Sequence, residues 1–368
     1  MSLINSQRLF QNPLFVIGMI TITINVLVSL GGANIRPDSS PFANNQYLEL
    51  AVLKPMTRVS FLKVPRAINA ENESWLNKYF VGSAENFQLI PFDSITIDGD
   101  NLVIKKYREE RFERFAISTL KVIEEDQKLG RWNVKDFIEE KTMVLGTDKY
   151  GRDLFSRLMA GTYISLSVGL ISVAISLILG ILLGLWAGYY RGWHDRIILW
   201  LINVVWSVPT LLLVISITLV LGKGFWQIFV AVGLTMWVEV ARVVRGQVLS
   251  MREKEFVEAG RVLGMSNMRI MIRHILPNIS GPIIVISAAN FATAILLEAG
   301  LSFLGIGSPP PQATWGKMIS EHKAFLITGD AHLALLPGIA IMLLVLSFTF
   351  IGNALRDAND ERILLKND

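Results

Sequence analysis

The stretch EAGRVLG at residues 258–264 lies between two long apolar runs, and HILP follows it at residues 274–277. In and just before the first stretch, the apolar residues Phe256, Ala259 and Leu263 stand at positions i, i+3 and i+7. This spacing places them on one side of a helical turn. It therefore predicts a short helix with one apolar face.

The end of this short helix is marked by a glycine. Gly264 suits the left-handed residue that commonly follows the last turn of a helix. Ser266 can cap a second helix, whose apolar residues repeat at helical spacing until Pro277 ends it. The segment therefore predicts two short helices that meet at a glycine and form a protruding knob, with several arginines around it.

The composition indicates a membrane protein. Hydrophobic residues make up 52% of the chain and charged residues 18%, which is too apolar for an ordinary soluble domain. Stretches almost without charge are long enough to cross a hydrocarbon core, which needs about 20 residues. The first lies within residues 1–35, and further helices are expected at about 162–190, 197–222, 224–243, 279–304 and 333–355. The stretch at 224–243 is shorter than the others and contains Glu239.

Lysine and arginine in short loops indicate the orientation, because these residues are retained on the cytoplasmic side. With the N-terminus inside, one side receives most of them: Arg8, Arg191, Arg196, those of 242–273, Arg356, Arg362 and Lys366. The other side receives Lys223, Lys317 and Lys323. Both termini and the knob are therefore expected in the cytoplasm.

The segment at 36–145 is long enough to hold a small folded domain on the outer side. Residues 95–104 alternate around Asp98-Gly99, a good hairpin signal. Residues 58–64 add a candidate strand, and 109–129 has charged and aromatic residues at helical spacing before Gly130, which predicts a helix. The segment is expected to be an α+β insert. It either receives a binding protein or forms a packing collar without a partner.

The sequence also argues against a cleaved signal peptide, cysteine chemistry and nucleic-acid binding. The first apolar run is longer than a usual signal-peptide core and no convincing cleavage site precedes Arg36, so an uncleaved anchor is expected. The absence of cysteine removes disulfide and thiolate chemistry. The high pI reflects the arginines of the inner side, and no interleaving of basic and aromatic residues predicts nucleic-acid binding.

The segment at about 245–278 resembles the EAA loop of ABC importer permeases, whose pattern is E-A-A-x3-G-x9-I-x-L-P. The residues that match are Glu258, Ala259, Gly264, Leu276 and Pro277. Gly260 replaces the second alanine, and His274 stands at the isoleucine position. The resemblance implies that these seven residues dock an ATPase. Without it, the segment would be read as a solvated loop with local helix.

Other segments resemble the dipeptide and oligopeptide (peptide/nickel) branch of these permeases. Residues 146–158 (GTDKYGRDLFSRL) are similar to its G-T-D-x-x-G-R-D-x-x-S-R-L segment, although Tyr163 replaces a common arginine. Residues 298–305 with Trp315 are similar to its fifth-span ending and outer loop, and 352–357 to its tail. The resemblance covers about 145–358. It implies an outer gate or loop motif formed by Asp148, Gly151, Arg152, Asp153 and Trp315.

The resemblance implies an all-α polytopic membrane protein with six transmembrane helices of the type I ABC importer permease fold. The expected parts are an N-terminal tip and first helix at 1–35, the extracytoplasmic insert at 36–145, the permease domain at 146–356 and a cytoplasmic tail at 357–368. The implied location is a bacterial inner membrane.

The implied partners are two ATP-binding subunits that hold ATP and magnesium, a second homologous permease subunit forming a heterodimer, and an extracytoplasmic solute-binding protein. No cofactor or metal is expected on this chain itself. Peptides are the implied cargo. Nickel, carried by close relatives, is less favoured because the chain has 4 histidines, although recognition lies mainly on the binding protein.

Four residues in the apolar runs are candidates for the translocation path: Asn203, Pro209, Asn290 and Glu298. Intramembrane acids and amides need polar company, so they face a protein interior or an aqueous path. For Glu298 an interface role competes with substrate contact, and for Asn290 helix pairing competes with lining the path. Pro209 bends a helix either statically or as part of a movement.

No reactive constellation predicts an enzyme, because the chain has no Gly-rich phosphate loop with its lysine, no H-E-x-x-H and no G-x-S-x-G. ATP hydrolysis is therefore expected on another polypeptide. A secondary transporter is the main alternative, but two related halves or a midplane ion site, which it would usually show, are not found. A membrane-anchored receptor or scaffold presenting the outer domain is another. Co-purification with an ATP-binding subunit separates the three.

Overall fold

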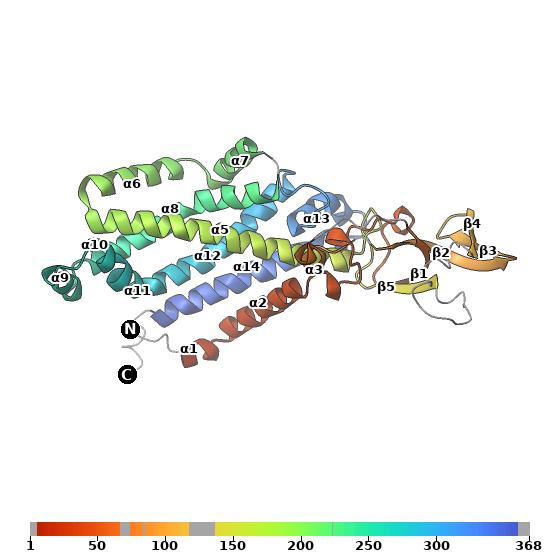
Figure 1. Ribbon diagram of the computed structural model, residues 1–368, viewed down its shortest axis with the longest axis horizontal. Helices are drawn as coiled ribbons and strands as arrows, with labels where there is room; N and C mark the ends of the chain where they lie inside the picture. The colour runs from red at the N-terminus through yellow and green to blue at the C-terminus, as the bar shows by residue number, and fades with distance from the viewer. Residues whose placement is uncertain (1–5, 67–73, 84, 118–136, 223, 360–368) are drawn as a thin grey trace.

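The computed structural model describes residues 6–66, 74–83, 85–117, 137–222 and 224–359. It shows a long bundle of helices with a β-sheet at one end (Figure 1). The helix α1 and the last turn of α14 lie at the opposite end of the bundle, on the side of α9 (Glu255–Val262). We call these the sheet end and the knob end.

In the part of the chain that the structure describes, five helices are long and apolar enough to cross a membrane, or six if a bent pair is counted as one span. The five begin and end as follows: α2 (Pro13–Gly31), α5 (Leu154–Tyr190), α8 (Phe225–Met251), α12 (Ser280–Phe303) and α14 (His332–Asn359). A short helix, α1 (Ser6–Gln11), precedes α2. Among the expected spans, those at 162–190, 279–304 and 333–355 correspond to α5, α12 and α14.

The expected continuous helix at 197–222 is wrong, because the structure breaks it. α6 (Gly192–Trp206) and α7 (Thr210–Leu221) meet at an angle of 92°. Pro209 stands directly before α7 with an extended backbone (ψ 128°). Proline disfavours the helical conformation of the residue before it and cannot donate the backbone hydrogen bond that would continue α6, so the turn of direction falls here.

The fourth span is longer than expected and is the most buried of the five. α8 continues to Met251, so the expected start of the loop at 245 is wrong. Arg245 lies within this helix and donates to Asp195 of α6 with two hydrogen bonds of 2.5 and 2.7 Å. The guanidinium of Arg242 lies 3.6 Å from the ring centre of Trp206.

Glycines bring α5 and α8 into close contact. Gly180, Gly184 and Gly188 lie on one face of α5 against Val240, Val244 and Val248 of α8. A Cβ on Gly184 would come within 2.7 Å of the Ala241 carbonyl oxygen. The small-residue pattern therefore serves helix packing.

The insert carries a five-stranded antiparallel sheet in the order β4-β3-β2-β1-β5. Its strands are β1 (Thr57–Pro65), β2 (Phe87–Asp98), β3 (Asn101–Lys106), β4 (Phe112–Ala116) and β5 (Ile138–Met143). The hairpin expected at 95–104 is present, with Asp98 paired to Asn101 and Gly99 at a φ of 57°. The strand expected at 58–64 is β1.

The helix expected at 109–129 is wrong over residues 112–116, which form β4, and residues 118–136 lie outside the described part of the chain. Contacts with the neighbouring strand β3 stabilise residues 112–116 as a strand, although the spacing of their side chains is typical of a helix. Phe115 pairs with Leu102, and Glu113 forms an ion pair of 2.7 Å with Lys106. Such pairs are the unit of sheet stability and are invisible to a pattern read along one strand.

Candidate functional site

The knob (residues 253–278) begins with α9. Val257 and Gly260 are its buried residues. Val257 packs into an apolar cluster with Val248, Ile270 and other residues at the ends of α5 and α8. The expected apolar face is therefore wrong, because the helix turns a neighbouring face inward and leaves Phe256, Ala259 and Leu263 exposed.

The turn after α9 has the conformation that its glycine predicts. Gly264 has a φ of 72°. Its N–H donates to the Arg261 carbonyl at 3.0 Å, and the Met265 N–H donates to the Gly260 carbonyl at 3.0 Å. This pair of bonds is the Schellman motif, which satisfies the carbonyl groups at a helix end.

The second part of the knob is helical but irregular. Ser266 precedes α10 (Asn267–Arg269), as expected for a cap, although its side chain makes no capping bond. A π-helix, η6 (Ile270–Ile275), and a short α11 (Leu276–Asn278) follow. The expected end at Pro277 is wrong by about one residue, since Pro277 occupies the first turn of α11, where its missing N–H is tolerated. His274 and Leu276 are half-buried.

Hydrogen bonds and charges tie the knob to the ends of α5 and α8. The hydroxyl of Tyr189 at the end of α5 donates to Asn267 Oδ1 at 2.9 Å. Arg252 donates to the Tyr189 carbonyl at 2.5 Å, and the guanidinium of Arg261 lies 5.3 Å from the Tyr189 ring centre. These contacts join the knob to the end of α5.

The exposed surface of the knob combines apolar and acidic residues. Val262 is 82% exposed and Leu263 74%, with Phe256, Met268 and Ile272 also exposed. Glu258 stands among them with its carboxylate in solvent. An apolar patch with an acid on a rigid support is what a protein–protein contact needs. The knob can therefore dock another protein.

At the sheet end, five charged or titratable residues form what we call the junction cluster: Asp148, Arg152, Arg157, Glu321 and His322. Arg152 donates to Asp148 at 2.6 Å and to Glu321 at 2.9 Å. Arg157 and the His322 imidazole each lie 3.9 Å from the Asp148 carboxylate. The cluster joins the start of α5 to α13 (Trp315–His322).

Burial sets the electrostatics of this cluster. Asp148 and His322 are fully buried and Arg157 is almost so. Burial lowers the pKa of His322, and the neighbouring Asp148 only partly offsets this. The arrangement is a set of buried ion pairs that joins the start of α5 to α13.

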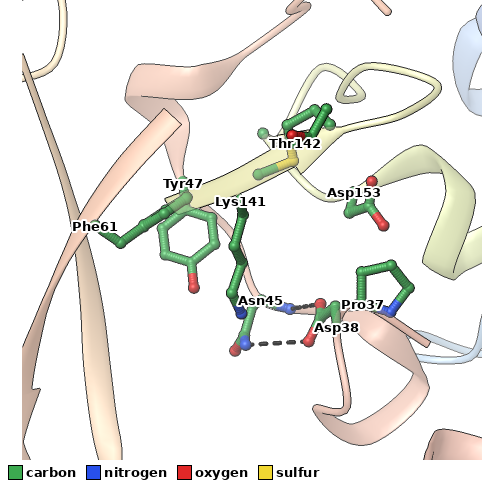
Figure 2. A pocket seen from close by; sticks show the side chains of 10 residues that line it. Pro37, Asp38, Asn45, Tyr47, Phe61, Lys141, Thr142 and Asp153 are labelled. Atoms are coloured by element: carbon green, nitrogen blue, oxygen red, sulfur yellow. Dashed lines mark hydrogen bonds between the residues drawn. The ribbon is translucent and has the colours of Figure 1, made fainter. Parts of the chain in front are cut away.

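A second set of contacts fastens the insert to the same place. Asp153 caps α5 by accepting from the Ser156 N–H at 2.9 Å. Asp38 accepts from the Asn45 backbone and side chain, and Figure 2 shows both bonds beside a small cavity of about 30 Å³. Gly151 has a φ of 73° and lies so close to the Tyr47 carbonyl that a Cβ would overlap it.

Trp315 completes the outer motif. Its indole N–H donates to the Leu158 carbonyl of α5 at 2.9 Å, and a Cβ on Gly161 would lie 2.5 Å from its ring. The structure therefore brings Asp148, Arg152, Asp153 and Trp315 together at the start of α5. Sequence reasoning missed the roles of Glu321 and His322, because an ion pair between Arg152 and a residue 169 positions away leaves no local signal in the sequence.

The four candidate path residues do not lie in one cavity of this chain. Asn203 and Pro209 are exposed on α6 and at the break before α7. Asn290 is fully buried in α12, and no described protein group is within hydrogen-bonding distance of its amide. Glu298 is buried and accepts from Ser302 at 2.6 Å. Glu298 thus has the structural contacts of an interior residue.

The structure offers one further place where a small group could be held. A polar hollow of about 560 Å³ lies in the insert between residues 40–49 and strands β2 to β4. Within the described ranges, no group of three or more His, Cys, Asp or Glu side chains is arranged to hold a metal ion.

Comparisons with known proteins give a consistent result. A family model for binding-protein-dependent transport system inner membrane components matches residues 180–365. The glutathione transport system permease protein GsiD of Escherichia coli O6:K15:H31 is 42% identical over 218 residues, covering 59% of this chain and 72% of that protein. The protein of the same name from Shigella flexneri serotype 5b is 44% identical over 218 residues, which again cover 59% of this chain and 72% of that protein.

Among solved structures, an inward-facing crystal form of the MetNI methionine ABC transporter is similar with a TM-score of 0.48 at 18% identity. The likeness covers 56% of this chain and 98% of that chain. The family match begins after the insert, which lies outside it.

Proposed function

Because the chain belongs to the binding-protein-dependent transport system inner membrane components, as an ABC importer permease of the peptide/nickel type, we propose that it moves di- or oligopeptides across the inner membrane. Two partner ATP-binding subunits bind ATP and magnesium and hydrolyse the ATP, and this chain itself is not an enzyme. A solute-binding protein delivers the peptide on the outer side. The fold that we propose for the complex is that of a type I importer.

The surface of the knob is the observation that carries this proposal. Val262, Leu263 and Glu258 are exposed on a helix whose other side is fixed to Tyr189 and Val248. Such a surface can fill an apolar cleft while the acid pairs with a basic residue. Movement of an ATP-binding subunit would then be transmitted along α5 to the junction cluster at the far end.

The proposed orientation places the knob end and both termini in the cytoplasm. It follows from the concentration of lysine and arginine at 242–273, which favours retention on that side. The sheet end then faces outward. In this orientation the insert stands where a solute-binding protein arrives.

The proposed path runs between this chain and a second, homologous permease subunit. Asn203 and Pro209 are exposed on the bent pair α6–α7, whose apolar surface includes Leu212, Leu219 and Val220. Exposed polar groups beside a break in a span are tolerated where they line an aqueous cavity formed with a neighbour. Asn290 and Glu298, being buried, support the shape of this chain.

The proposed cargo rests on the peptide/nickel type of the chain and on its likeness to a permease named for glutathione transport. Glutathione is itself a short peptide. The chain's 4 histidines give little support to nickel as the cargo. Uptake of labelled peptides and of nickel by cells with and without this chain distinguishes the two.

Substitution of the knob's acid tests the proposal. Glu258→Lys in the assembled complex is expected to reach normal expression but to lose peptide-stimulated ATP hydrolysis, because the charge facing the ATP-binding subunit is reversed. Asp357→Lys is the matched control, since Asp357 is an exposed acid at the same end of the bundle. Wild-type transport by the Glu258 variant would refute docking through the knob. Transport without ATP would support a secondary transporter instead.

A further inference from the structure

The helix α3 (Trp75–Phe80) packs where the first span ends. The chain leaves α2 through a short 3-10 turn, η1 (Gly32–Ile35). The Tyr79 carbonyl lies so close to Gly32 that a Cβ there would overlap it. Arg36 also donates to the Val81 carbonyl at 2.8 Å. These contacts fix α3 against the sheet-side end of α2 (Figure 1).

The length of α2 places α3 at the bilayer surface. Its residues Pro13–Gly31 extend for roughly 28 Å at the α-helical rise, close to the hydrocarbon thickness of about 30 Å. Little of α2 is covered by the rest of the chain. Large apolar side chains are exposed along it: Ile17, Ile20, Ile24, Leu27 and Leu30. The end of this lipid-facing surface that is nearest the sheet therefore lies at the depth of the lipid headgroups. The helix α3 lies beside this end of α2.

An aromatic ladder connects α3 to the bundle. The ring centres of Trp75 and Tyr79 are 6.2 Å apart, and those of Tyr79 and Phe80 are 5.0 Å apart. Phe80 stacks on Tyr163 of α5 at 5.4 Å. Trp75 is 70% exposed and Leu76 50%, so the outer end of the ladder is uncovered. The inner end is held firmly by α5.

We propose that α3 is an interfacial anchor, with Trp75 and Leu76 inserted among the headgroups and upper acyl chains of the outer leaflet. Tryptophan and tyrosine favour this depth because each has an apolar ring and a polar group. Lys78 is exposed on the same short helix and can reach a lipid phosphate. The continuity of this surface with the exposed face of α2 selects the bilayer as its partner. The inference goes beyond the proposed function and requires only that α2 spans the membrane.

The absence of cysteine makes the test direct. Trp75→Cys and Leu76→Cys are made separately in the full chain, labelled with a polarity-sensitive fluorophore and reconstituted in vesicles of phosphatidylethanolamine and phosphatidylglycerol. Quenching is measured with lipids carrying a nitroxide near the headgroup or deep in the acyl chain, and with aqueous iodide. Ile24→Cys on α2 is the hydrocarbon reference, and Asp100→Cys at the β2–β3 turn is the aqueous reference.

The expected result is strong quenching at both sites by the shallow nitroxide, several-fold above that at Asp100, and weaker quenching by the deep nitroxide than at Ile24. Iodide quenching equal to that at Asp100, with no lipid quenching, would overturn the proposal. Protection from both kinds of quencher would overturn it as well, because it would mean that protein covers the helix. Vesicles of phosphatidylcholine alone show whether anionic headgroups strengthen the contact.

Discussion

The guanidinium of Arg152 lies 2.9 Å from the carboxylate of Glu321, although the two residues are 169 positions apart in the sequence. Arg152 also donates to Asp148, so one side chain fastens the start of α5 to the end of α13. Both contacts are at the sheet end, where the insert meets the bundle. The knob lies at the other end of the same helix α5, which therefore connects the two candidate sites.

Loss of Arg152 is predicted to destabilise the chain strongly. Arg152→Met removes the cation that contacts the buried Asp148 and the half-buried Glu321 and leaves Asp148 only the more distant Arg157; breaking a buried ion pair costs about 3–5 kcal/mol. Glu321→Gln is expected to cost less, because Arg152 keeps Asp148. Thermal unfolding of the purified chain in detergent measures both, and Arg356→Met, whose partner Asp357 is exposed, provides the control. Equal losses for Arg152→Met and Arg356→Met would contradict a structural role for the cluster.

The contact between α5 and α8 is so close that adding one methyl group to it is predicted to lower the stability of the chain. Gly184→Ala would press on the Ala241 carbonyl and Val244, and overpacking of this kind costs about 1–3 kcal/mol. Gly246→Ala on α8 is the matched control, since open space surrounds it and alanine favours a helix. The midpoints of thermal unfolding should move in opposite directions. A neutral Gly184 variant would show that the two helices can separate without loss.

Two glycines of positive φ separate backbone strain from steric overlap. Gly99→Ala adds only the strain of a left-handed residue, about 1 kcal/mol, because nothing lies near its Cβ position. Gly151→Ala adds the same strain and an overlap with the Tyr47 carbonyl. The second variant is therefore expected to lose the tight junction, which limited proteolysis between insert and bundle would detect. Similar digestion patterns for the two variants would argue against this reading.

The buried imidazole of His322 predicts a dependence of stability on pH. Burial lowers its pKa below the ordinary value of about 6.5, so the unfolded chain binds a proton that the folded chain does not. Stability from this group is complete above that ordinary value and is lost as the pH falls toward the lowered one. Asp153 has the opposite sign, because its pKa is raised by burial and its ionisation opposes folding as the pH rises above about 3.8.

Replacement of His322 isolates its contribution. His322→Gln is expected to flatten the fall in thermal midpoint between about pH 7.5 and pH 5.5, while wild-type protein shows it. The groups that face this imidazole are Asp148, Glu321 and Arg152. If the variant and the wild type lose stability in parallel, another group is responsible.

The exposed apolar residues of the knob are predicted to matter for assembly rather than for folding. Val262→Ser and Leu263→Ser should leave thermal stability within about 0.5 kcal/mol. Each should weaken binding of the ATP-binding subunit by about 1–2 kcal/mol, measured by co-purification at graded subunit concentration. Ile327→Ser, equally exposed near the sheet end, controls for a general effect of lost apolar surface. Undiminished assembly in both knob variants would place the docking surface elsewhere.

The extent to which the sequence predicts this protein differs between its parts. The left-handed Gly264 and the hairpin at Gly99 were both predicted, because each depends on residues close in the chain. The face of α9 was predicted wrongly, since Phe256 and Val257 are both apolar. Packing against Ile270 decided between them.

By itself the sequence determined the long apolar stretches, the asymmetric placement of arginine and lysine, and the glycine patterns, because water, lipid and backbone sterics act on every residue locally. Only the tertiary structure decided the angle of 92° at the break that Pro209 causes, the strand at 112–116, and the pairing of Arg152 with Glu321. Each of these depends on a partner distant in the chain or on the space that neighbouring helices leave. Such contacts produce no repeating pattern of residues along the sequence.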